Sequence, residues 1–142
     1  MMFSYQDELK NFGQRAEVSL ELLYKSLVKV NKSNNFLNKT LLDAGCGNGK
    51  TVKELTELIN FKKIDGIEVN KFAVDYLTNN PKENPYEYIY NSHILDFQPK
   101  EKYDFCILVE VLEHLYVKDV IPVLQKLLSI CDNLIITTPH PS

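Results

Sequence analysis

The sequence predicts an α/β fold, a doubly wound and mostly parallel sheet of about five strands with an N-terminal helical segment. Two observations predict it. Short apolar runs alternate along the chain with longer segments of helical periodicity, and this order produces parallel strands joined by helices. A turn with three glycines directly follows the first apolar run, which is typical of strand-to-helix turns at the carboxyl edge of such a sheet.

The expected elements follow one another in that order. Apolar residues spaced three and four apart predict a helix over residues 14–30, with an inward face formed by Ala16, Leu20, Leu23, Leu27 and Val30. Strands are predicted at residues 40–43, 63–70 and 86–90, from residue 103 and from residue 133, and a helix at residues 50–59. Asp119 is the expected N-cap of the last helix, with Pro122 in its first turn.

Composition narrows the class of protein. The chain has 142 residues, of which 44% are hydrophobic and 25% charged, which is enough for the core of one globular domain. No apolar run reaches membrane-spanning length and the N-terminus is polar and acidic, so we expect no membrane segment, no secretion signal and a cytoplasmic location. The net charge of −3 includes no basic stripe that would indicate nucleic-acid binding. Cys46, Cys106 and Cys131 lack metal-site spacing and are expected to be free thiols.

The glycine turn is the most informative segment, and it reads Asp43-Ala44-Gly45-Cys46-Gly47-Asn48-Gly49. Glycines at alternate positions allow positive φ angles and a close approach of the backbone to a small polar ligand. A dinucleotide fingerprint is disfavoured because its third glycine would fall at Lys50. A nucleotide-binding P-loop, and with it a phosphotransferase, is a closer alternative, since Ala44 to Thr51 departs from that motif only at its first glycine. Asp43 argues against it, because a carboxylate there would repel a triphosphate.

The same turn closely resembles the first motif of the class I S-adenosylmethionine (SAM)-dependent methyltransferases. Three further segments resemble the family in the right order: the strand ending in Glu68, the segment from Tyr103 through Leu115, and the final Asn-Leu-Ile-Ile-Thr-Thr-Pro run. The resemblance implies a Rossmann-like domain with SAM as cofactor. It implies one domain over residues 1–142, with residues 1–38 as a helical cover and residues 39–142 as the cofactor-binding core.

The resemblance also implies the residues that bind SAM, and these are Asp43, Gly45, Cys46, Gly47, Asn48, Glu68, Val69, Asp96 and Glu110. Glu68 is expected to accept hydrogen bonds from the ribose hydroxyls, and Asp43 to face the methionine amine. The acid that contacts adenine in many members falls here at either His93 or Asp96, and Asp96 is favoured.

Glu110, Glu113 and His114 are the predicted catalytic residues. If they were helical, their spacing would place them on one side, directly past the fourth strand. A similar Glu-x-x-Glu-His segment holds a divalent metal in RNA 2′-O-methyltransferases, but many small-molecule methyltransferases carry it without metal. We therefore expect no metal and a small-molecule acceptor, with metal-dependent RNA methylation as an alternative.

Five strands are fewer than the seven of complete family members, so the sequence is expected to be truncated after the fifth. A non-catalytic SAM-binding module that needs a partner is therefore a second alternative. A homo-oligomer or a partner chain would then complete the sheet.

Overall fold

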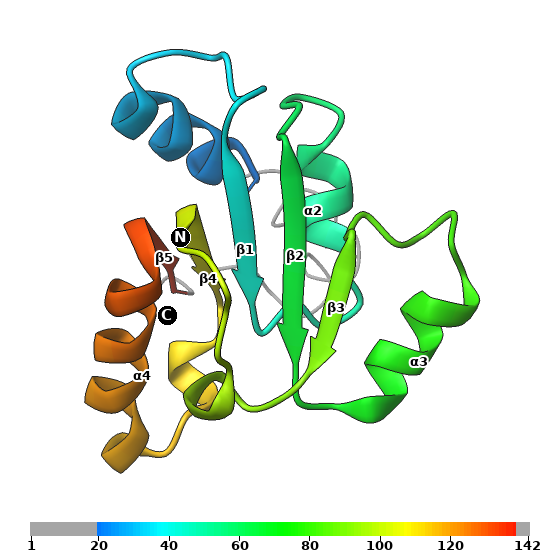
Figure 1. Cartoon of the computed structure of the whole chain (residues 1–142), viewed down its shortest axis with the longest axis vertical. Coiled ribbons are helices and arrows are strands. Elements are labelled where there is room, and N and C mark those ends of the chain that lie inside the picture. The colour runs from blue at the N-terminus through cyan, green and yellow to red at the C-terminus, as the bar shows by residue number, and fades with distance from the viewer. Residues whose placement is uncertain (1–19, 139–142) are drawn as a thin grey trace, which may run out of the picture.

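The computed structural model describes residues 20–138 and contains a five-stranded, all-parallel sheet of order β3-β2-β1-β4-β5 (Figure 1). The predicted α/β class is thereby confirmed. The strands are β1 (Thr40–Ala44), β2 (Lys63–Glu68), β3 (Tyr88–Asn91), β4 (Tyr103–Val109) and β5 (Cys131–Thr137). Because the chain reverses its direction of winding at β1, the crevice at the carboxyl ends of β1 and β4 is where ligands of such sheets bind.

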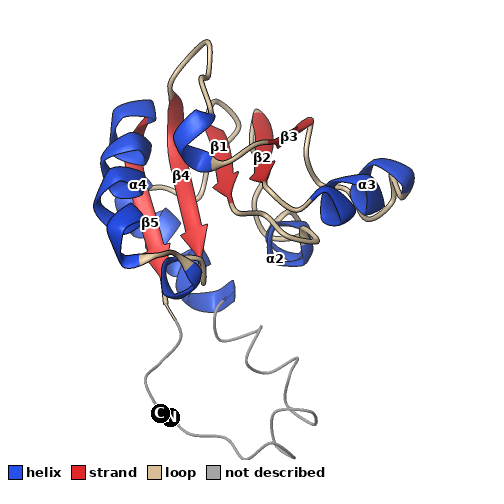
Figure 2. Cartoon of the chain, turned by 90° about the horizontal axis from the view of Figure 1, so that it is seen from below, coloured by secondary structure: helices blue, strands red, loops and turns tan. Residues whose placement is uncertain are grey.

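The helices cover both faces of the sheet. The helix over residues 20–31, α2 (Lys50–Leu55) and α3 (Lys71–Asn79) contribute to one apolar core, and α4 (Val117–Ile130) contributes to the other. In Figure 2, α4 lies beside β4 and β5, whereas α2 and α3 lie at the β2–β3 end of the sheet. Neighbouring strand residues alternate between these cores, as the period of two in a strand requires: Leu41 packs in the first and Leu42 in the second.

The inward face predicted for the first helix is confirmed only in part. Leu23 and Leu27 are buried, but Val30 is 45% exposed. Ala16 lies outside the described residues. The helix ends at residue 31, and Phe36 then enters the core, where its ring lies 5.6 Å from that of Phe105. Among the described residues no helix is long and apolar enough to cross a membrane.

The predicted start of the last helix was wrong by three residues. Helix α4 begins at Val117 with Tyr116 as its N-cap, so Pro122 lies inside the helix rather than in its first turn. Asp119 is in the first turn, where a carboxylate stabilises the positive end of the helix dipole without capping it. An acidic residue is favoured both at the N-cap and in the first turn of a helix, so the presence of an acid did not by itself locate the N-cap.

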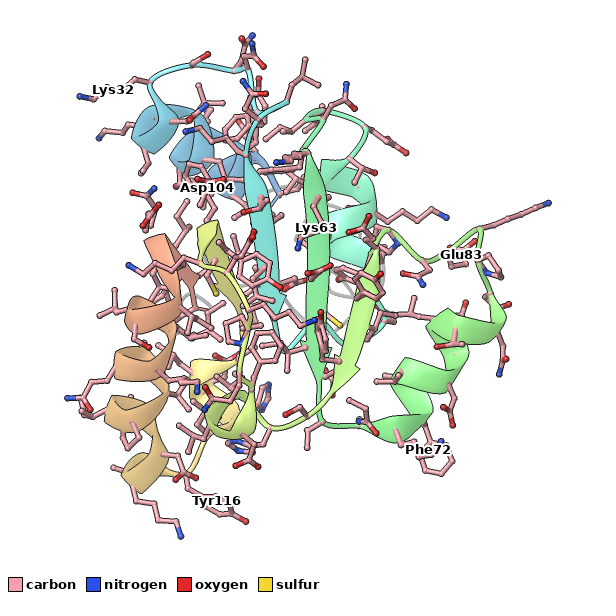
Figure 3. The ribbon with its side chains drawn as sticks, viewed as in Figure 1. Lys32, Lys63, Phe72, Glu83, Asp104 and Tyr116 are labelled. Atoms are coloured by element: carbon pink, nitrogen blue, oxygen red, sulfur yellow. The ribbon has the colours of Figure 1, made fainter. Side chains whose placement is uncertain are left out.

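Two buried or half-buried acids hold the amino-terminal half of the sheet together. Asp104 Oδ2 accepts hydrogen bonds from the Thr40 backbone N–H at 2.8 Å and from its hydroxyl at 3.2 Å, which joins β4 to β1 (Figure 3). Asp65 is fully buried and accepts from the Tyr103 hydroxyl at 2.6 Å. Both acids have structural partners far from the carboxyl edge.

Candidate active site

The glycine turn connects β1 to α2 and is fixed to the neighbouring strand. Gly45 and Gly47 have φ angles of 76° and 55°. The backbone N–H groups of Gly45 and Cys46 both donate to the carbonyl of Ile67, at 2.8 and 2.9 Å. A Cβ at Gly45 would lie 2.7 Å from Val111 Cγ2, so glycine is required there by contact as well as by conformation.

Gly47 differs from Gly45, since a Cβ there would meet nothing within 4 Å. We therefore expect Gly47→Ala to destabilise the chain by only about 1 kcal/mol, the cost of a left-handed backbone for an L-residue. Gly45→Ala should cost more because it adds the clash with Val111. Urea unfolding of both variants measures this difference, and an equal loss of stability would contradict the crowding at Gly45.

Glu68, at the end of β2, holds the glycine turn from the side. Its Oε1 accepts from the Gly47 N–H and its Oε2 from the Asn70 N–H, both at 2.8 Å. A carboxylate can accept about four hydrogen bonds, so two positions remain for a ligand. Glu68 therefore fixes the turn and still presents acceptors for a pair of hydroxyl groups.

A cavity of about 340 Å³ opens at this carboxyl edge, a size suited to a small molecule or cofactor. It brings together five of the predicted site residues: Gly45, Glu68, Val69, Glu110 and His114. The other lining residues are Ile67, Ser92, His93, Ile94, Val109, Val111 and Leu115. The wall is thus mostly apolar, with a few polar side chains contributed by the ends of β2, β3 and β4.

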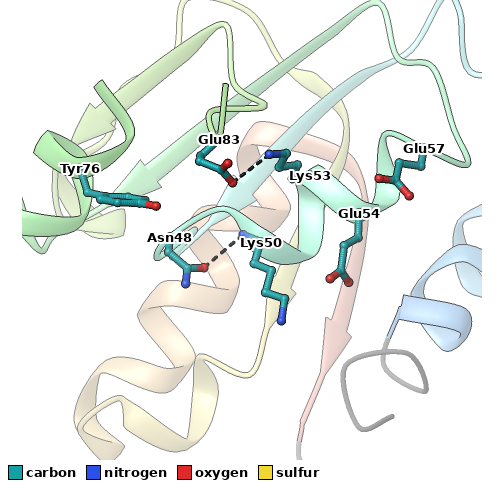
Figure 4. A pocket seen from close by; sticks show the side chains of 7 residues that line it. All are labelled: Asn48, Lys50, Lys53, Glu54, Glu57, Tyr76 and Glu83. Atoms are coloured by element: carbon teal, nitrogen blue, oxygen red, sulfur yellow. Dashed lines mark hydrogen bonds and ion pairs between the residues drawn. The ribbon is translucent and has the colours of Figure 1, made fainter. Parts of the chain in front are cut away.

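Four predicted residues of the turn do not line this cavity, namely Asp43, Cys46, Gly47 and Asn48. Asn48 lines a separate cleft with Lys53 and Glu83, which form an ion pair at 2.8 Å (Figure 4). Its Oδ1 accepts from the Lys50 backbone N–H at 3.1 Å, so its side chain stabilises the start of α2. Cys46 is buried beneath the turn, and desolvation raises the pKa of its thiol.

Asp43 does not line the cavity either, because it is buried beneath the turn at 4% exposure. Its Oδ2 accepts a hydrogen bond of 2.6 Å from the Tyr86 hydroxyl. Burial raises the pKa of Asp43 to about 7, the Tyr86 hydrogen bond lowers it, and the negative charge of Glu68 raises it. A carboxyl group in this environment becomes fully ionised at neutral pH only if a cation binds nearby.

Tyr86 is the hydrogen-bond partner of Asp43, and the sequence did not reveal this role. It precedes β3, and its ring packs where Gly49 and Gly66 have no side chain: a Cβ at these positions would lie 3.0 and 3.2 Å from ring carbons. The missing side chains were visible in the sequence, but the residue that fills the space could not be identified from spacing.

The segment after β3 places His93, rather than Asp96, at the cavity. Ser92, His93 and Ile94 line it, whereas Asp96 is exposed and does not. His93 Nδ1 accepts from the Leu95 N–H at 3.1 Å and caps the short turn η1 (Ile94–Asp96).

The three predicted catalytic residues do not share a helical face. Glu110 has a φ of 55°, and only a single turn, η2 (Leu112–His114), follows it. Glu110 and His114 line the cavity, and Glu113 does not. Glu113 instead lies 3.6 Å from His114 Nε2. Within residues 20–138, no group of three or more histidine, cysteine or acidic residues could hold a metal ion.

The strained backbone at Glu110 is itself informative. A left-handed conformation costs a non-glycine residue about 1–2 kcal/mol, and such strain tends to persist at functional sites. The Glu110 N–H donates to the Thr137 carbonyl at 3.0 Å, which ties this residue to the end of β5.

Comparisons with known proteins agree with this geometry. In sequence, the chain is 34% identical over 113 residues to alpha N-terminal protein methyltransferase 1 of Dictyostelium discoideum, covering 77% of this chain and 42% of that protein. In structure, it resembles the N-methyltransferase NodS of Bradyrhizobium japonicum with a TM-score of 0.64 and 19% identity, over 88% of this chain and 65% of that one. An amino pentose methyltransferase of Micromonospora echinaspora gives a TM-score of 0.71 and 14% identity, over 99% and 58%.

The chain therefore spans less than half of its Dictyostelium relative. The family described as "Methyltransferase domain" matches residues 42–133, which include the glycine turn, Glu68 and the Glu110–His114 segment. This match confirms the predicted Rossmann-like, SAM-dependent class and leaves no support for the P-loop alternative. The chain belongs to the methyltransferase domain family.

Proposed function

We propose that this chain binds SAM in the cavity at the carboxyl edge and transfers its methyl group to an amine nitrogen. The observation that carries the proposal is Glu68, which lines the cavity and has acceptor capacity beyond the two backbone N–H groups of the turn that it holds. Gly45 of the turn lines the same cavity, and the apolar wall suits the remainder of a nucleoside.

The sheet order arranges these groups in a line. Gly45 follows β1, Glu68 ends β2 and His93 follows β3, and these strands are adjacent. A ligand with an amino-acid end, a ribose and a base fits this order when its ribose lies at Glu68. We infer that Gly45, Glu68 and Val69 hold the cofactor in this way, with Asp43 supplying negative charge from beneath.

The acceptor is expected at the end of β4. When bound, SAM would supply an electrophilic methyl group to the acceptor nitrogen and would leave as the neutral thioether. Glu110 attracts an amine by its charge, and the His114 imidazole can take the proton that the nitrogen releases. Positioning supplies most of the rate enhancement in such a displacement.

An amine acceptor is favoured by the Dictyostelium relative, whose name describes methylation at protein N-termini. Two large exposed aromatic residues lie at the carboxyl edge of the sheet (Figure 3). They are Phe72, which is 86% exposed, and Tyr116, which is 77% exposed. They offer contact surface to an acceptor larger than the cavity. A small-molecule acceptor, a cytoplasmic location and a partner chain that completes the sheet stay predictions.

Binding is tested first, by thermal unfolding. SAM and S-adenosylhomocysteine (SAH) should raise the melting temperature, because a ligand of the native state stabilises it by mass action, whereas ATP with magnesium should not. A shift with ATP alone would contradict the proposal.

Transfer is tested next, with methyl-labelled SAM and matched acceptors. A peptide with a free N-terminus and an amino sugar should accept label, and their acetylated forms should not. Binding without transfer to any acceptor would instead support the non-catalytic module.

A further inference from the structure

Helix α4 carries two apolar stripes, and only one of them is buried. The buried stripe consists of Val123, Leu127 and Ile130, which pack in the core beneath the helix. The outer stripe consists of Val117, Ile121, Leu124 and Leu128. Leu124 is partly buried, but Val117, Ile121 and Leu128 are 91%, 61% and 60% exposed. A row of exposed apolar side chains marks a surface that packs against another protein.

The outer stripe has the spacing of a helix-packing seam. Its residues are separated by four, three and four positions, so they lie within about 60° around a helix of 3.6 residues per turn. The centre of the outer stripe is about 120° from the centre of the buried one, and the outer stripe is about 16 Å long. Figure 2 shows α4 beside β5, the last strand in the sheet order, so a second helix can approach it from that end of the sheet.

We infer that the outer stripe is a homodimer interface, in which α4 packs antiparallel against α4 of a second copy of this chain. The four positions are symmetric about their midpoint, so a two-fold axis there places Val117 opposite Leu128 of the other copy and Ile121 opposite Leu124. Each apolar side chain therefore meets an apolar side chain, as an isologous contact requires. The inference does not rest on the proposed function, because no residue of the outer stripe lines the cavity.

The residues beside the outer stripe favour the antiparallel arrangement. One flank is polar and contains Lys118 and Gln125, whereas the flank toward the buried stripe is apolar and contains Val120 and Leu127. In an antiparallel pair the two polar flanks meet, which brings the Lys118 ammonium near the Gln125 amide of the second copy. A parallel pair would instead place Lys118 against Val120 and remove a charge from water without a partner.

The expected dimer is weak. One pair of helices buries less than the roughly 800 Å² per partner that is typical of stable complexes, so we expect reversible association at high micromolar concentration. Sedimentation equilibrium of the full chain from about 10 μM to about 1 mM should show a monomer passing to a dimer and no larger species.

Ile121→Glu and Leu128→Glu should each abolish the dimer, because the two-fold axis brings a charge from each copy into an apolar contact. Both residues are exposed in the monomer, so the fold should survive, and circular dichroism checks this. Leu22→Glu makes the same change at a residue of the first helix that is also exposed, and this variant should dimerise like the wild type.

Gln125→Glu tests the orientation of the helices by a gain of affinity. The new carboxylate would face Lys118 of the second copy on both sides of the axis, so association should tighten several-fold at low salt. The inference is overturned if the chain stays monomeric at every concentration, if the dimer survives Ile121→Glu, or if Gln125→Glu does not strengthen it. A monomer in which Ile121→Glu weakens methyl transfer to a peptide would assign the outer stripe to the acceptor and would also overturn the homodimer.

Discussion

Replacing Glu68 by alanine is expected to weaken binding of SAM and SAH by about 10- to 100-fold, or about 1.5–3 kcal/mol. The variant loses the charge-assisted acceptors proposed for the ribose hydroxyls. It also releases the N–H groups of Gly47 and Asn70, each held at 2.8 Å, so the glycine turn is less ordered before the ligand binds. Titration calorimetry on the folded variant measures the loss.

Glu68→Gln is a stricter test of the same site. Each carboxylate oxygen accepts one backbone N–H, so an amide must direct its NH₂ toward one of the two donors. We expect an affinity between those of the wild type and the alanine variant. Glu87→Gln changes an exposed acid outside the cavity and should bind normally. Wild-type affinity in Glu68→Ala would place the ribose contact elsewhere.

The parts of the site that are local in sequence were predictable. An apolar run followed by alternate glycines is compatible with few backbone conformations. The acid at the end of the next strand follows at a sequence separation typical of a βαβ unit. The turn, its position after β1 and the place of Glu68 at the end of β2 follow from these patterns.

Contacts between distant segments were not predictable in the same way. Tyr86 reaches Asp43 across 43 residues, and no periodicity marks that pairing. The prediction of a shared face for Glu110, Glu113 and His114 was wrong for another reason. A spacing of three and four residues places side chains on one face only if the backbone is helical, and Glu110 has a left-handed φ of 55°. After β3, His93 rather than Asp96 lines the cavity. His93 also caps the single turn η1, and the sequence pattern did not predict this local hydrogen bond.

The Tyr86–Asp43 pair makes both the stability of the fold and the affinity for the cofactor depend on pH. With its pKa raised to about 7 mainly by burial, Asp43 is largely protonated below neutral pH. The folded chain binds this proton more tightly than the unfolded chain, whose carboxyl has an ordinary pKa. The free energy of unfolding should therefore fall as pH rises from about 4 to about 7, as far as Asp43 determines it.

Cofactor binding should have the opposite dependence. SAM carries a positively charged sulfonium and an amine, and an ionised carboxylate beneath the turn attracts positive charge in the site. Ionised Asp43 is thus the form that favours binding, so SAM affinity should increase from pH 5 to a plateau above pH 7. Asp43→Asn should remove most of this dependence.

Tyr86→Phe tests the hydrogen bond while it keeps the ring that fills the space beside Gly49 and Gly66. The Tyr86 hydroxyl lowers the pKa of Asp43, so its loss should shift the pH midpoint of SAM binding upward and reduce affinity at pH 7 several-fold. Affinity should recover toward the wild-type value near pH 8.5, because Asp43 is then ionised in both proteins. Calorimetric titrations across this range distinguish the electrostatic effect from a packing defect, since a packing defect would weaken binding equally at every pH.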